Sequence, residues 1–303
     1  MKKAFYSFMA FLILILGSCQ ESAYVDDIQE SSSKASVLSP KVEDDVITKL
    51  QAYNDSLNNN TESVYSINRS FKSSLDVALA DCIGFWNGAA VGMTVTAAGG
   101  PLVSAWGGLI GGTLFGAYNS YIASSNSIIV PADGYNQSVS AYIKMKEEIE
   151  DYQEHYPAMI ALNLPAGKQD LQIAGAQHNL TLNNIKKKRF SSTSLKKAYD
   201  NGTLTKNEYL VLGHKDMRIL FDNMRNNQLS SIPGEKPKTI IRLYNQAVLN
   251  SAFSYTDIES ISNRYIGEVY STEELDADQK DNIASSICVL VSSVEYWKAF
   301  DGQ

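Results

Sequence analysis

The sequence predicts an all-α fold, a bundle-like helical domain built around a glycine-rich helical hairpin. Apolar residues recur every three or four positions in successive segments from residue 42 onward, as they do on one face of a helix. No segment alternates convincingly between apolar and polar residues, which is the pattern of a half-buried strand. Small residues recur every fourth position over residues 82–125, a spacing typical of two helices that pack closely.

The first helix is expected from residue 42 to the three asparagines at 58–60. Acidic residues at 43–45 would lie in its first turn, where carboxylates interact favourably with the positive end of the helix dipole. Its apolar face consists of Val42, Val46, Leu50, Tyr53 and Leu57.

The expected hairpin follows from a segment without charge. Residues 82–132 contain no Lys, Arg, Asp, Glu or His, although 19% of the whole chain is charged. On each side of Gly99-Gly100-Pro101, a strong turn signal, small residues recur four apart and share one helix face. Glycine costs a helix about 1 kcal/mol relative to alanine, so a close backbone approach is the expected compensation. The predicted packing glycines are Gly84, Gly88, Gly92, Gly100, Gly108, Gly112 and Gly116.

Either lipid or the rest of the protein must cover the large side chains of this hairpin. Leu102–Ile122 is 21 residues, about 31 Å as a helix, whereas Ile83–Ala98 is only 16 residues, about 24 Å. Both segments are diluted by Gly, Ser, Thr and Asn. We therefore expect a hairpin buried in a helical core, with membrane insertion as the alternative.

The remainder of the chain predicts ordinary amphipathic helices. A capping box at Thr205 and Glu208 opens one of them, and Ser271 with Glu274 is expected to form a second box. The other helices are expected over residues 139–156, 170–185, 237–250, 256–270 and 278–297.

The N-terminus predicts export and lipid anchoring. Two lysines precede an apolar run from residue 5 to residue 16, too short for a comfortable membrane span but suited to a signal peptide. The run ends in Leu16-Gly17-Ser18-Cys19, which resembles a lipobox; an uncleaved anchor is the alternative. We expect a signal peptide at 1–18, acyl groups on Cys19 and a flexible acidic and Ser-rich tether at 19–40. Residues 41–303 would then form a single domain.

The two remaining cysteines leave two interpretations open. An exported chain meets oxidising conditions, so a Cys82–Cys288 disulfide is one. Both residues lie in apolar, helix-like stretches, which favours two buried thiols acting as small apolar side chains.

Catalytic and metal-binding signatures are absent from the sequence. Of the three histidines, none has neighbours at ligand spacing, so we expect no metal site and no cofactor. His178 with Asn179 is a weak candidate for a polar site, and a hydrogen-bonded pair between packed helices is the simpler interpretation. Residues 200–208 resemble half of an EF-hand loop but lack its first two carboxylates. A formal charge of −7 argues against a nucleic-acid partner.

Together these motifs resemble glycine-zipper lipoproteins of Bacteroidetes. The likeness is carried by the lipobox, the glycine hairpin, the stretch Gly175-Ala-Gln-His178-Asn179 and the C-terminal Tyr296-Trp297. It implies a lipid-anchored envelope protein, and Gln20 after Cys19 favours the outer membrane. No catalytic residue comes with the resemblance. We expect a non-enzymatic structural or interaction protein with a protein partner; the alternative is a secreted, bacteriocin-like effector whose hairpin inserts into membranes.

Overall fold

The computed structural model describes residues 45–59, 69–96, 101–124, 133–155, 160–225, 235–252 and 254–301. All regular structure in these ranges is helical, which confirms the all-α prediction. The predicted signal peptide, Cys19, the tether and Gly100 lie outside the described residues. The helices are α2 (Val46–Asn59), α3 (Arg69–Thr96), α4 (Pro101–Ser124), α5 (Gly134–His155), the 3-10 helix η2 (Gln169–Gln172), α6 (Ile173–Lys186), α7 (Leu195–Asp200), α8 (Lys206–Leu212), α9 (Lys215–Arg225), α10 (Glu235–Ser251), α11 (Tyr255–Ser271) and α12 (Ala277–Asp301).

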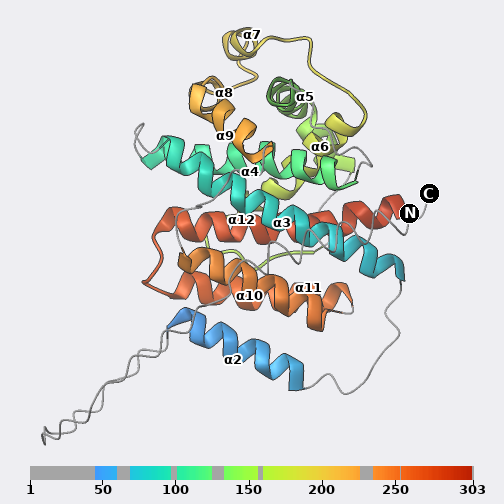
Figure 1. Cartoon of the computed structure of the whole chain (residues 1–303), viewed down its shortest axis with the longest axis vertical. Helices are drawn as coiled ribbons and strands as arrows, with labels where there is room; N and C mark the ends of the chain where they lie inside the picture. The colour runs from blue at the N-terminus through green and yellow to red at the C-terminus, as the bar shows by residue number, and fades with distance from the viewer. Residues whose placement is uncertain are drawn as a thin grey trace, which may run out of the picture. The chain divides into compact units, whose positions relative to one another are not determined.

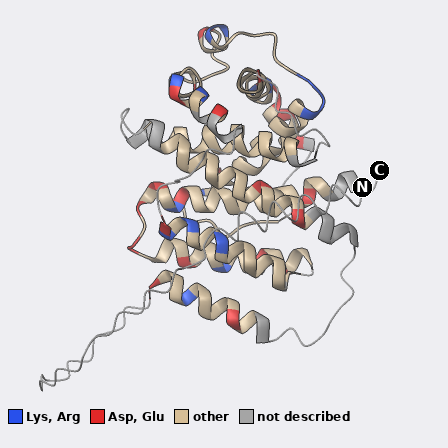
Figure 2. Cartoon of the chain, viewed as in Figure 1, with Lys and Arg blue, Asp and Glu red and all other residues tan. Residues whose placement is uncertain are grey.

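The hairpin of α3 and α4 lies in the middle of the helices from α2 to α12 (Figure 1). Helix α12 packs along α3, and α10, α11 and α2 follow on that side. Helices α6, α5 and α8 pack on the other side, against α4 or against one another. The charged side chains lie mostly on the surrounding helices, while the described part of α4 carries none (Figure 2).

Two apolar clusters flank the hairpin. One joins α2, α3, α10, α11 and α12 and includes Tyr244 and Ile287; the other joins α4, α5, α6, α8 and α9 and includes Tyr118 and Phe221. From Gly107 to Ser120 every residue of α4 is buried except Leu109 and Asn119, which are half-buried. The protein itself therefore covers this stretch. No helix in the described ranges combines the length and the apolar character that a membrane span requires.

The backbones of α3 and α4 approach most closely at four glycines. A β-carbon on Gly92 would overlap the carbonyl oxygen of Gly107 and lie 2.7 Å from its carbonyl carbon. A β-carbon on Gly88 would likewise overlap the carbonyl oxygen of Gly111, and one on Gly111 the carbonyl oxygen of Gly88. We call Gly88, Gly92, Gly107 and Gly111 the glycine seam. No side chain larger than hydrogen fits there at this helix separation.

The predicted α4 ladder lies beside the seam and receives side chains. A β-carbon on Gly112 would lie 2.7 Å from the ring of Phe85, and one on Gly108 would lie 2.7 Å from the amide of Asn282 on α12. At Gly116 the nearest atoms belong to His178 on α6 and to the Phe85 backbone, both 3.1 Å away. Helix α4 therefore has two adjacent small faces, of which the sequence spacing indicated one. A β-carbon on Gly84 would make only ordinary van der Waals contacts, with its nearest atoms, in Asn119 and Gly116, 3.4 Å away.

Several helix ends differ from the prediction by a few residues, and three features differ more. Helix α3 begins at Arg69, well before Cys82, because helical structure continues into residues that carry charge. The helix that the Thr205–Glu208 box opens is short: α8 ends at Leu212, and a second helix, α9, begins at Lys215 after the Gly213 cap. The second capping box was wrong, because α11 continues to Ser271, whose hydroxyl donates to the Glu268 carbonyl. The first box, at Thr205 and Glu208, is confirmed.

We predict that Gly92→Ala and Gly267→Ala change stability in opposite directions. Gly267 lies on α11, and a β-carbon added there would have nothing within 4 Å, so alanine should raise the free energy of unfolding by up to about 1 kcal/mol. Alanine at Gly92 overlaps the Gly107 carbonyl and should lower the free energy of unfolding by about 2 kcal/mol or more. Urea denaturation followed by circular dichroism measures both. Equal stabilisation by the two variants would contradict the seam.

Candidate functional site

The sequence-predicted pair His178 and Asn179 belongs to a buried polar cluster. With Asp81, Ser120 and Trp297 they form what we call the His178 cluster, whose members come from α3, α4, α6 and α12. Each is buried; Asp81 and His178 have no exposed surface at all. Helical packing brings together residues that lie far apart in the sequence.

Asp81 accepts hydrogen bonds on both carboxylate oxygens. The Ser120 hydroxyl donates to Oδ1, and the indole Nε1 of Trp297 donates to Oδ2 over 2.9 Å. Ser120 Oγ also lies 2.8 Å from the Gly116 carbonyl oxygen and 3.4 Å from His178 Nε2. These bonds satisfy a carboxylate whose burial would otherwise be costly.

The orientation of Asn179 determines the tautomer of His178. Asn179 Nδ2 donates to the Ser292 carbonyl over 3.0 Å, so the amide oxygen faces the histidine. That oxygen lies 3.1 Å from His178 Nδ1 and also accepts from Ser293 Oγ over 3.2 Å. Because an amide oxygen only accepts, Nδ1 carries the proton, and in the neutral ring Nε2 carries none. The hydrogen of the Ser120 hydroxyl is donated to Asp81, so the 3.4 Å approach of Ser120 Oγ to Nε2 is a contact without a donated hydrogen.

A lysine lies on the far side of Trp297. Lys186 Nζ is 4.3 Å from the centroid of the Trp297 ring, in cation–π contact. Burial lowers the pKa of Lys186, while the negative charge of Asp81 acts in the opposite direction. The indole therefore contacts a cation with its face and a carboxylate with its N–H.

The order of groups in the cluster differs from that of a nucleophilic triad. In a triad the imidazole lies between hydroxyl and carboxylate and removes the hydroxyl proton. Here the Ser120 hydroxyl lies between the Asp81 carboxylate and the His178 ring. The arrangement supports a structural role, since its hydrogen bonds connect α3, α4, α6 and α12.

Known proteins give no guide to this site. No family model, no curated protein and no solved structure matches the chain. Within the described ranges no group of His, Cys, Asp and Glu is arranged to hold a metal ion.

Cys82 and Cys288 are both free thiols and both buried. The structure therefore has no Cys82–Cys288 disulfide, and the two thiols act as small apolar side chains in the core. Burial raises the pKa of Cys288 to about 12 and raises that of Cys82 further above its usual range, with the charge of Asp81 adding to the effect at Cys82. Both groups therefore stay protonated and unreactive.

A surface pocket that the sequence did not predict lies between α5, residues 191–195 and the junction of α8 with α9. It encloses about 520 Å³. Its lining includes Tyr135, Ser140, Leu212, His214, Lys215 and Arg218. No local motif marks these residues, because only the packing of α9 on α5 brings them together. The spacing of Lys215 and Arg218, three apart on one helix, is the one signal that the sequence contains.

We predict that Trp297→Phe destabilises the protein more than Trp86→Phe does. Both indoles are buried, but Trp86 Nε1 has no acceptor among the described residues, whereas Trp297 Nε1 donates to Asp81. Losing that donor leaves a buried carboxylate short of one bond, which costs about 1–3 kcal/mol beyond the shared loss of volume. Guanidinium denaturation of the two variants measures the difference. Equal losses would show that the bond to Asp81 contributes nothing.

We also predict that a Cys19→Ala protein, folded and without reductant, fails to react with a thiol reagent over minutes. The same sample in denaturant should release two thiols per chain, because Cys82 and Cys288 are buried and unpaired. If no thiol reacts in denaturant and two thiols per chain react after reduction, the two cysteines form a disulfide.

Proposed function

We propose that this protein is a lipid-anchored component of a bacterial cell envelope with a non-enzymatic, structural or interaction role. The lipobox-like Leu16–Cys19 and the polar segment after it support anchoring through acyl groups on Cys19. In this proposal the helical domain stays folded at the membrane surface, catalyses no reaction and offers its exposed helices to a protein partner.

The observation that carries the proposal is the burial of Asp81. This carboxylate lies on the hairpin helix α3 and accepts bonds from Ser120 on α4 and Trp297 on α12. A hairpin that left the protein for a bilayer would lose the Trp297 donor and carry a charged group toward hydrocarbon, which costs several kcal/mol. The buried carboxylate therefore favours a hairpin that remains in the core.

The alternative is an effector whose hairpin inserts into a target membrane. The length of α4, 24 residues without a charge, is the feature that favours it. The two functions predict different behaviour of the protein without its lipid anchor. In the proposed function the hairpin stays in the core when lipid is present, whereas in the alternative it inserts into the bilayer.

We predict that Cys19→Ala moves the protein from the membrane fraction to the soluble fraction of expressing cells, because the acyl chains supply the membrane affinity. Purified Cys19→Ala protein should release no dye from liposomes of phosphatidylethanolamine and phosphatidylglycerol. Fractionation with immunoblotting and fluorescence dequenching are the two measurements.

Gly112→Leu and Gly267→Leu serve as matched variants in the leakage assay. Leucine at Gly112 meets the Phe85 ring, whereas leucine at Gly267 meets open space. Leakage by the parent protein that Gly112→Leu abolishes and Gly267→Leu retains would overturn the proposal in favour of insertion. Retention of Cys19→Ala in the membrane fraction would refute anchoring through this cysteine.

A further inference from the structure

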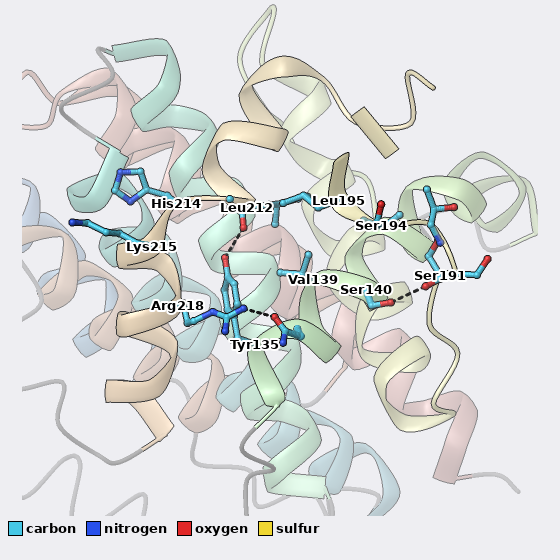
Figure 3. A pocket seen from close by; sticks show the side chains of 15 residues that line it. Tyr135, Val139, Ser140, Ser191, Ser194, Leu195, Leu212, His214, Lys215 and Arg218 are labelled. Carbon is cyan, nitrogen blue, oxygen red and sulfur yellow. Dashed lines mark hydrogen bonds between the residues drawn. The ribbon is translucent and has the colours of Figure 1, made fainter. Parts of the chain in front are cut away.

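The surface pocket beside α9 has a volume of about 520 Å³, within the range of small-molecule sites. Figure 3 shows three zones along it: His214 and Lys215 at one end with Arg218 further in beside Tyr135, apolar side chains in the middle, and serines at the other end. This sequence of zones suggests a ligand with a matching order of groups.

The first zone is cationic. The lining has two full positive charges, Lys215 and Arg218, and no Asp or Glu, although the chain has a net charge of −7. Arg218 is held by neutral groups: it donates to the Asn136 side-chain oxygen and lies 5.5 Å from the centroid of the Tyr135 ring. No ion pair among the described residues includes Arg218 or Lys215, so both charges are available to an anion.

His214 places an imidazole ring beside these two charges. Its Nδ1 accepts from the Asp216 backbone N–H over 3.3 Å and lies 3.7 Å from the Asp216 carboxylate. Helix α9 begins at the next residue, Lys215, so the positive end of its dipole has the same sign as the two side chains.

The middle zone is a fixed apolar surface. Val139 and Leu212 are buried, and the Tyr135 hydroxyl donates to the Leu212 carbonyl over 2.9 Å. Burial raises the pKa of Tyr135, only partly offset by the charge of Arg218, so the phenol stays neutral. A surface of this kind suits the C–H faces of a compact ligand better than a second charged group.

The third zone presents hydroxyls on an ordered segment. Ser140 Oγ donates to the Ser191 carbonyl over 3.0 Å, and the Ser191 N–H donates to the Ser140 carbonyl over 3.3 Å, which fixes the segment to α5. Ser192 and Thr193 also line the pocket. The Ser191 hydroxyl donates to Glu147 Oε1 over 2.8 Å, and the Thr193 hydroxyl donates to the same oxygen over 3.4 Å. Their oxygens can still accept, so this end is suited to hydroxyl groups of a ligand that donate.

We propose that this pocket binds a small anionic sugar derivative. Its carboxylate or phosphate would lie against Lys215 and Arg218, its C–H face against Val139 and Leu212, and its hydroxyls against the serine end. Each zone excludes one class of ligand. Neutral sugars lack an anionic group for the cationic zone, simple anions lack a C–H face for the apolar zone, and fatty acids lack hydroxyls for the serine end. The proposal does not depend on lipid anchoring.

Isothermal titration of the Cys19→Ala protein tests it with four probes: D-glucuronate, D-glucose 6-phosphate, methyl glucoside and inorganic phosphate. At least one of the two sugar anions should bind tenfold or more tightly than methyl glucoside and inorganic phosphate, and which one does so distinguishes a carboxylate from a phosphate ligand. Affinity should fall with added salt, because the contacts at the cationic end are partly exposed.

The pocket variant Lys215→Gln/Arg218→Gln should weaken sugar-anion binding at least tenfold. Its matched control, Lys238→Gln/Arg242→Gln, removes the same charges from exposed positions on α10 and should leave binding unchanged. Equal affinities for sugar anions, neutral sugar and inorganic phosphate, or equal effects of the two double variants, would overturn the proposal. If the pocket variant unfolds, the ring resonances of His214 in the unmutated pocket decide: they should shift with the sugar anion and not with methyl glucoside.

Discussion

The close approach of the α3 and α4 backbones is the contact on which the other helix positions depend. At Gly88 and Gly92 the two helices are separated by little more than their own backbones, facing Gly107 and Gly111. This closeness brings the second small face of α4 within reach of its neighbours. Side chains from α12 and α6, Asn282 and His178, then fill the space above Gly108 and Gly116. Glycine is unfavourable within an isolated helix, so the seam is stable only because the surrounding helices pack around it.

Smooth glycine faces bring two helices together but only weakly determine how far one is shifted along the other. The His178 cluster fixes that shift, because hydrogen bonds break when donor and acceptor move apart by an ångström or two. Asp81 and Ser120 join α3 to α4, and Trp297 and Asn179 extend the connection to α12 and α6. Close packing and a satisfied polar network thus have complementary roles: the first provides contact area and the second specifies one arrangement.

The sequence was sufficient for the fold class and for most helices, since apolar periodicity and the Thr205–Glu208 capping box are local signals. It was sufficient for only half of the seam. Fourfold spacing marked Gly88 and Gly92 on α3, which lie in the seam, but on α4 it marked Gly108, Gly112 and Gly116, which lie beside it. The double glycines at 107–108 and 111–112 define two faces, and only tertiary packing determines which one meets α3. The pocket was invisible for a similar reason: Tyr135 and Arg218 are far apart in the sequence and each is unremarkable in its own helix.

The bond between Trp297 and Asp81 joins residues 216 positions apart. One is on the first helix of the hairpin and the other is near the end of α12, the last described helix. The centre of the domain is therefore incomplete until residue 297 is available, and a shorter N-terminal part of the chain has the Asp81 carboxylate without its indole donor. Contacts of such long sequence separation slow folding, because a large loop must close before they form. The hairpin, although made of neighbouring helices, is thus among the last parts of the domain to reach its final environment.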